Sequence, residues 1–199
     1  MKAIKRFVYR NWQRVHGVRR LELAVLTRYL DLDGRRRIVD VGSGKGAFCG
    51  MLARGGHDAV GVDPSAAAAE IAKTYVNPNG RFVLGAGEAL PLSAGRFDRA
   101  VSVCVLEHTT DDTGVLAEVH RVLEPGGVLA LTVDCLDSPR ISEEFRQHHR
   151  EEYRCNQLYS DAKLRKLLGD AGFETLETRY LFGGRLSIAI LRFGSLFHY

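Results

Sequence analysis

Short apolar runs alternate along this chain with segments whose apolar positions recur at helical spacing. The apolar runs predict strands over Ile38–Val41, Ala59–Asp63, Arg81–Leu84, Phe97–Val105 and Val128–Val133. The helical pattern predicts helices over Ala47–Arg54, Ser65–Tyr75 and Val115–Leu123, with glycine or proline close after each end.

The order of these elements indicates an α/β fold: a doubly wound, mostly parallel, Rossmann-like sheet with helices on both faces. Ligands of such sheets bind beyond the carboxyl ends of the strands, near the point where the strand order reverses. Asp40, Asp63 and the segment Cys104–His108 all follow or end a predicted strand. We therefore expect the functional site at this edge.

The remainder of the chain is expected to complete one domain of 199 residues, with residues 1–30 as a helical cap and 31–135 as the core. Polar residues 136–160 predict a lid-like insertion, helical within Ser138–Tyr159. Residues 161–199 are expected to finish the sheet. Within this last part, Ser160–Leu168 predicts a helix and Gly172–Tyr180 a sixth strand.

Composition indicates the role of the cysteines, whether a metal is bound and the cellular compartment. Four cysteines without a C-x-x-C spacing favour core packing, and no compact His/Cys/Asp cluster has the spacing of metal ligands, so we expect no metal. No apolar run follows the basic N-terminus, which predicts a cytoplasmic protein without a signal peptide.

The sequence allows two structural interpretations for each end of the chain. Basic and apolar residues interleave before residue 20, predicting an amphipathic helix that either meets an acidic surface or packs Trp12 over the cofactor. The formal charge of +4 is low for a nucleic-acid binder, so no nucleic acid is expected. Residues 181–199 are apolar but interrupted by glycine and arginine, and form either a strand or a helix facing lipid or a partner.

The segment Val39–Gly46 carries the strongest chemical signal. A buried strand leads into glycines at alternate positions, and a helix follows whose amide groups point toward the turn, which predicts a nucleoside-containing cofactor. A P-loop is excluded because Val39 stands where its first glycine belongs and Gly46 where its hydroxyl belongs.

Two cofactor classes remain at this point. Gly42, Gly44 and Ala47, with Asp63 about twenty residues on, also fit the dinucleotide fingerprint. Asp40 discriminates between them, because its carboxylate would repel a pyrophosphate and attract the cationic amino acid end of S-adenosylmethionine.

Four separated segments resemble class I S-adenosylmethionine-dependent methyltransferases, in particular the quinone and sterol methyltransferase-like small-molecule subgroup. They are Val39–Gly46, Asp63-Pro64, Leu90-Pro91-Leu92 with Phe97-Asp98, and Leu116-x-x-Glu118-x-x-Arg121-Val122-Leu123-x-Pro125-Gly126-Gly127. They span about residues 38 to 133, and Gly172-Phe173 adds a weaker match. The resemblance implies seven strands, the last of them antiparallel at Ile188–Leu191.

The resemblance also implies the cofactor-binding residues: Asp40, Gly42, Ser43, Gly44, Gly46, Asp63, Pro64, Gly87, Glu88 and Cys104. Asp63 would accept both ribose hydroxyls, and the loop Gly85–Glu88 would run along the adenine. The chain departs from the family at Ala86, where an acid is common. That departure keeps open a methyltransferase-like scaffold without turnover, beside the NAD-dependent oxidoreductase.

The expected chemistry is methyl transfer to a hydroxyl, amine or carbon of a small metabolite or glycan. A hydroxyl acceptor needs a base, and His108 follows the fourth strand at the cofactor edge. His148 and Tyr159, in the lid-like insertion, are further candidates. The sequence indicates neither the acceptor nor the oligomeric state.

Overall fold

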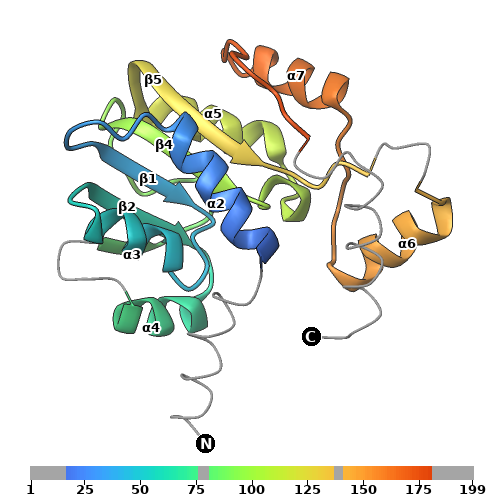
Figure 1. Cartoon of the computed structure of the whole chain (residues 1–199), viewed down its shortest axis with the longest axis horizontal. Helices are drawn as coiled ribbons and strands as arrows, with labels where there is room; N and C mark the ends of the chain where they lie inside the picture. The colour runs from blue at the N-terminus through green and yellow to red at the C-terminus, as the bar shows by residue number, and fades with distance from the viewer. Residues whose placement is uncertain (1–16, 76–80, 137–140, 181–199) are drawn as a thin grey trace, which may run out of the picture.

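The computed structural model describes residues 17–75, 81–136 and 141–180 (Figure 1). The strands in these ranges are β1 (Arg37–Val41), β2 (Asp58–Asp63), β3 (Arg81–Leu84), β4 (Phe97–Val103) and β5 (Leu123–Thr132). The helices are α2 (Gly17–Tyr29), α3 (Ala47–Arg54), α4 (Ala66–Tyr75), the 3-10 turn η1 (Leu106–His108), α5 (Asp112–Val122), α6 (Glu143–Glu152) and α7 (Asp161–Asp170).

The five strands form one parallel sheet in the order β3-β2-β1-β4-β5. Asp40 in β1 lies opposite Gly61 in β2 and Val101 in β4, so the centre of the sheet is in register. The strand order reverses between β1 and β4, and all carboxyl ends meet at one edge. This confirms the predicted doubly wound α/β class for the described residues.

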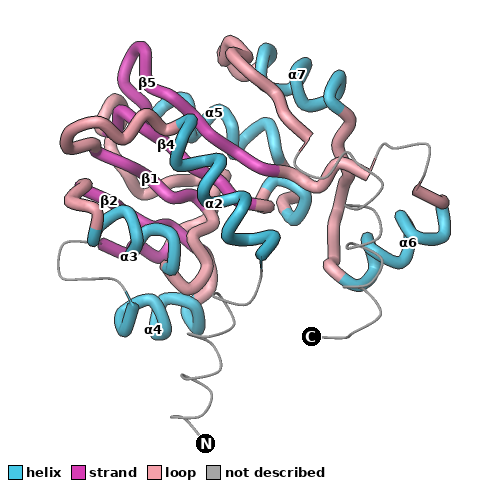
Figure 2. Tube along the Cα trace, in the orientation of Figure 1, coloured by secondary structure: helices cyan, strands magenta, loops and turns pink. Residues whose placement is uncertain are grey.

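Alternate residues of the strands face opposite sides of the sheet. Figure 2 shows α2 and α3 in front of the strands and α5 behind them. On one face, Ile38 and Val101 pack in a cluster with α2 and α3, through residues such as Leu26 and Leu52. Val39, Val41, Val60 and Val62 belong to the other cluster, with the apolar side chains of α5 and partly buried ones of α7. Both faces are covered, which explains why the strands read as continuous apolar runs.

Most predicted elements lie within about three residues of their predicted bounds, whereas β5, α6 and the segment after α7 differ more. β5 begins at Leu123 rather than Val128, because the backbone turns extended at Leu123 and pairs with Phe97. The predicted strand over Gly172–Tyr180 is wrong: these residues form no strand. Phe173 packs against the core, but Leu176 and Tyr180 are exposed, so the segment lacks the burial that would hold it on a sheet edge.

Some of the sequence predictions concern residues outside the described ranges. The basic segment 1–16 and the alternative strand or helix of 181–199 lie outside the described residues, as does the family's last strand. Among the described helices, none is both long and apolar enough to cross a membrane.

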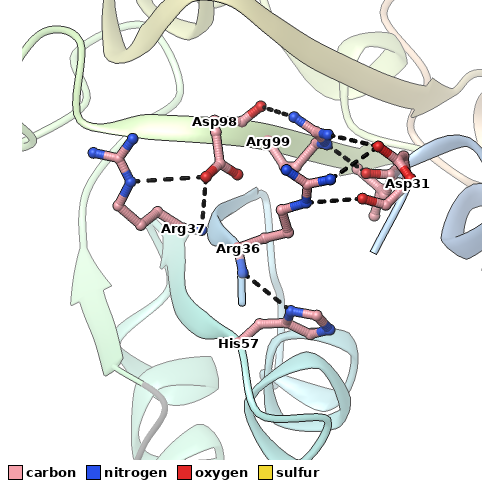
Figure 3. Close-up of polar contacts among 7 residues, drawn as sticks. Asp31, Arg36, Arg37, His57, Asp98 and Arg99 are labelled. Atoms are coloured by element: carbon pink, nitrogen blue, oxygen red, sulfur yellow. Dashed lines mark hydrogen bonds and ion pairs between the residues drawn. The ribbon is translucent and has the colours of Figure 1, made fainter. Parts of the chain in front are cut away.

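A network of polar side chains lies at the amino ends of the strands (Figure 3). The guanidinium of Arg99 is almost buried; it donates to the carbonyl oxygens of Leu30 and Asp98 and lies 3.2 Å from the Asp31 carboxylate. Arg37 lies 3.7 Å from Asp98 on the neighbouring strand. The network therefore fixes the end of α2 and the loop after it to the start of β4.

We expect the substitution Arg99→Ala to lower the free energy of unfolding by about 3 kcal/mol, because the Leu30 carbonyl loses a charged donor and a cavity remains. Chemical denaturation measures this loss. Arg36→Ala removes an exposed pair with Asp31 and should cost less than about 1 kcal/mol. Equal effects of the two substitutions would contradict the structural role assigned to Arg99.

Candidate active site

The glycine loop lies between the end of β1 and the start of α3. Gly42, Gly44 and Gly46 have φ values of 71, 53 and 73°, a region that side chains disfavour. A Cβ on Gly42 would lie 2.3 Å from Val105, whereas a Cβ on Gly44 would meet no atom within 4 Å. Gly42 is therefore required by packing, and Gly44 faces space outside the protein's own packing.

Asp63, at the end of β2, holds this loop in place. One carboxylate oxygen accepts from the Gly44 amide at 2.8 Å, and the other accepts from the Ser65 amide at 2.9 Å. The amides of Gly42 and Ser43 both donate to the Val62 carbonyl oxygen. Pro64 follows on the surface. The loop is thus hydrogen-bonded to the end of β2, and the Asp63 carboxylate lies at the carboxyl edge beside the glycines.

Asp40 lies beneath the loop rather than in the open. Its side chain is 2% exposed and accepts from the Cys49 amide in the first turns of α3 at 3.1 Å. Burial raises the pKa of this carboxyl to about 7, the Cys49 amide counteracts the rise, and the charge of Asp63 adds to it. Two acidic groups therefore share the space under the glycine loop.

We expect the unliganded protein to lose stability as pH rises from about 4 to 7. The folded state holds the Asp40 proton up to about pH 7, whereas the unfolded state releases it near its ordinary value of 3.8. Stability is thus greatest below the unfolded pKa and falls as pH passes through the folded pKa. Each pKa unit corresponds to about 1.4 kcal/mol, giving an effect of a few kcal/mol.

Denaturation across this pH range, with Asp40→Asn as the comparison, tests the assignment. An asparagine oxygen can still accept from Cys49, so the variant should fold and show a shallower slope. Burial also raises the pKa of Glu107 to about 7, so part of the slope remains in the variant. An unchanged slope would contradict the role given to Asp40.

The loop after β3 is fixed by α5. Glu118 accepts from the Leu90 amide at 2.8 Å, and Arg121 donates to the carbonyl oxygens of Leu92 at 2.9 Å and of Leu90 at 3.0 Å. Arg121 also donates to Glu118 at 2.6 Å, and this bond lowers the pKa of the Glu118 carboxyl. Two of the segments that carried the family resemblance are thus hydrogen-bonded to each other.

The predicted adenine residues lie just before this fixed turn. Gly87 approaches Val115 and Val41 so closely that a Cβ would lie 3.2 Å from Val115. Glu88 is partly buried, whereas Ala86 is exposed and its carbonyl oxygen accepts from Ala89. The backbone is therefore shaped tightly at Gly87, and Ala86 contributes no polar side chain.

Cys104 and His108 follow β4. Cys104 has a φ of 52°, and its amide donates to the Thr132 carbonyl oxygen, which joins the ends of β4 and β5. His108 is exposed at the end of η1, with Nδ1 3.5 Å from the Arg154 carbonyl oxygen. Both residues lie at the carboxyl edge, as predicted.

The two candidate catalytic residues of the lid-like segment, His148 and Tyr159, lie in different surroundings. His148 is exposed on α6 and pairs with Glu152 at 3.1 Å. Tyr159 is 1% exposed in the core, and its hydroxyl donates to Asp112 at 2.9 Å. The structure therefore places neither side chain beside the glycine loop, and Tyr159 has the surroundings of a structural residue.

The histidine of α6 that faces the sheet edge is His149 rather than the candidate His148. His149 lies 2.7 Å from Asp134, just after β5, and its ring contacts those of Phe145 and Tyr153. The spacing of these aromatic residues, at positions i, i+4 and i+8, could have indicated the inner face of the helix.

The residues present fit S-adenosylmethionine. The open side of Gly44, the acids Asp40 and Asp63, and the buried Ser43 hydroxyl without a hydrogen-bond partner in the described structure all gather at one turn. Acidic groups suit a cationic cofactor and oppose a pyrophosphate. Fold and site together define a Rossmann-like protein that binds a nucleoside cofactor carrying positive charge.

Comparisons with known proteins agree. Residues 39–131 match the family model described as a methyltransferase domain. A ubiquinone biosynthesis O-methyltransferase of Azorhizobium caulinodans is 30% identical over 170 residues, covering 77% of this chain and 67% of that protein. A solved methyltransferase of Thermotoga maritima, titled SAM-dependent and a possible histamine N-methyltransferase, is 31% identical with a TM-score of 0.65, covering 85% and 79% of the chains.

The chain belongs to the S-adenosylmethionine-dependent methyltransferases. S-adenosylmethionine is its cofactor, and the dinucleotide alternative is abandoned. The chain covers only 39% of the length of an uncharacterized Mycobacterium methyltransferase that is 36% identical to it. Its own substrate therefore has to be inferred from its own residues.

Proposed function

We propose that the protein transfers a methyl group from S-adenosylmethionine to a hydroxyl group of a small metabolite. The observation that carries the proposal is the hydrogen bond from the Gly44 amide to Asp63, which holds the glycine loop beside a carboxylate at the carboxyl edge of the sheet, with Asp40 buried beneath the loop. The O-methyltransferase name of the Azorhizobium relative supports a hydroxyl acceptor.

Each cofactor residue has a proposed task. Gly44 and Gly46 leave room for the backbone to approach the cofactor, Gly42 lets the loop pack against Val105, and Asp63 accepts from the ribose hydroxyls while still holding the loop. Asp40 and Ser43 favour the amino acid end. Pro64, Gly87, Glu88 and the backbone at Cys104 complete the lining in this proposal.

S-adenosylmethionine, when bound, supplies a methyl group that its sulfonium already activates. The chain then has to align the acceptor and remove its proton, and alignment alone supplies much of the acceleration. We assign the base to His108, because it is exposed at the same edge and a neutral imidazole can accept the proton of a hydroxyl group.

Two measurements test the proposal. Calorimetric titration with S-adenosylhomocysteine should show saturable binding, and transfer of a labelled methyl group into a metabolite extract should yield a methyl ether by mass spectrometry. His108→Ala should lower kcat and leave S-adenosylhomocysteine affinity unchanged, whereas His148→Ala should change neither. A methylated amine or carbon as the product would replace the hydroxyl acceptor, and binding without any product would favour a scaffold.

A further inference from the structure

A cluster of ligand-type side chains lies beyond the carboxyl ends of β4 and β5. Potential ligand atoms of Asp134, His149 and Cys155 all lie within 4.8 Å of one another. A second set, Cys104, Glu107 and Asp134, has the same spacing and shares Asp134 with the first. The cluster therefore combines thiol, imidazole and carboxylate groups from the ends of two strands, from η1, from α6 and from the segment after α6.

The first set has separations close to those of a bound metal. Asp134 Oδ2 lies 2.7 Å from His149 Nε2 and 3.9 Å from Cys155 Sγ. Tetrahedral zinc with ordinary bond lengths separates such ligand atoms by about 3.3 to 3.8 Å. Replacement of the protons that His149 and the Cys155 thiol share with Asp134 by a metal ion thus needs the Asp134–His149 separation to widen by about 0.6 Å.

Glu107 provides an independent observation. Its side chain is 0% exposed, one oxygen accepts from the Asp134 amide at 3.2 Å, and Oε2 is buried without a hydrogen-bond partner in the described structure. Within residues 17–75, 81–136 and 141–180, neither Glu107 nor Asp134 forms an ion pair with lysine or arginine. A buried carboxylate oxygen without a donor is costly unless a proton or a cation satisfies it.

We propose that Asp134, His149 and Cys155 bind a zinc-type divalent ion, with the Glu107 carboxylate in the adjoining set that shares Asp134. Thiolate and imidazole ligands select zinc over magnesium or calcium, which prefer oxygen alone. Both Cys155 and Glu107 are buried, so the ion would be shielded from water on the protein side. This inference goes beyond the proposed function, because it holds whichever acceptor the enzyme methylates.

The position of the ion follows from the topology. Asp134 lies two residues after β5, and Glu107 lies within η1 after β4, so the cluster is at the same sheet edge as the glycine loop. A metal there would stand beside the ends of β4 and β5, where the acceptor is expected. Residue spacing does not reveal the cluster, because Asp134 and Cys155 are 21 residues apart along the chain.

The test uses the full chain after dialysis against a chelator and titration with Co²⁺ as a spectroscopic probe. We expect about one equivalent to bind, with a thiolate-to-cobalt charge-transfer band and tetrahedral visible bands, and Zn²⁺ should displace the cobalt. Cys155→Ser should abolish the charge-transfer band, and His149→Ala should weaken binding about 100-fold.

Matched controls lie beside each ligand. Cys135→Ser changes a thiol outside both clusters, and His148→Ala changes the adjacent histidine, which pairs with Glu152. Both should bind cobalt as the wild type does. Absence of binding to the wild-type chain, or a charge-transfer band that survives Cys155→Ser, would overturn the proposal. Titration of S-adenosylhomocysteine remains a separate measurement, so failure of the metal site and failure of the cofactor site are distinguishable.

Discussion

Asp63→Ala is expected to weaken S-adenosylhomocysteine binding about 100-fold, since hydrogen bonds to a charged group contribute about 1.5 to 3 kcal/mol each. The carboxylate accepts from the amides of Gly44 and Ser65, so its removal also releases the glycine loop from β2. Calorimetric titration measures the affinity, and thermal unfolding measures the accompanying loss of stability.

Asp58 provides the control for this experiment. It stands at the other end of the same strand and pairs with Arg81 at 2.8 Å on the exposed amino side. Asp58→Ala should leave the affinity unchanged and cost less than about 1 kcal/mol. Asp63→Asn extends the test, because an amide nitrogen cannot accept from a backbone amide. A folded Asp63→Ala protein with wild-type affinity would contradict the assignment.

Gly42→Ala and Gly44→Ala are expected to fail in different ways. The Gly42 Cβ would meet Val105 at 2.3 Å in addition to the strain of a φ of 71°, so we expect a loss of about 3 kcal/mol in stability. The Gly44 Cβ would meet nothing within 4 Å, so only the backbone strain of about 1 kcal/mol remains. Its methyl group would instead occupy the side proposed for the cofactor.

Chemical denaturation and S-adenosylhomocysteine titration of both variants separate these effects. Gly42→Ala should show the larger loss of stability, and Gly44→Ala the larger loss of affinity relative to its loss of stability. In the double variant with Val105→Ala, Gly42→Ala should regain part of its stability, because the clashing side chain is removed. Without such recovery, the close contact with Val105 would not be the reason for this glycine.

Much of the fold could be predicted from the sequence, because most of its elements have local signals. α3 and β3 have the predicted bounds, because glycines and a turn cluster delimit them. Buried strands and a glycine loop are local patterns, and each is visible within about ten residues. The segment 172–180 was misassigned because a strand depends on a neighbour to pair with, and the residues themselves do not supply one.

The candidate site likewise has a part that the sequence predicts and a part that it does not. Asp40, Asp63 and the glycines were identified from their positions at strand ends, where topology brings them together. The residue types alone do not separate the adjacent histidines His148 and His149. Only the orientation of α6 decides that His149 meets Asp134 while its neighbour stays exposed.

By itself, the sequence determined the alternation of strands and helices, the glycine loop and the class of cofactor, because each depends on residues that are neighbours in the chain. Tertiary structure decided that Asp63 holds the loop, that Glu118 and Arg121 fix the turn at Leu90, and that Asp134, His149 and Cys155 converge. These contacts join residues far apart in sequence. Their geometry depends on how the elements pack, which periodicity and spacing do not encode.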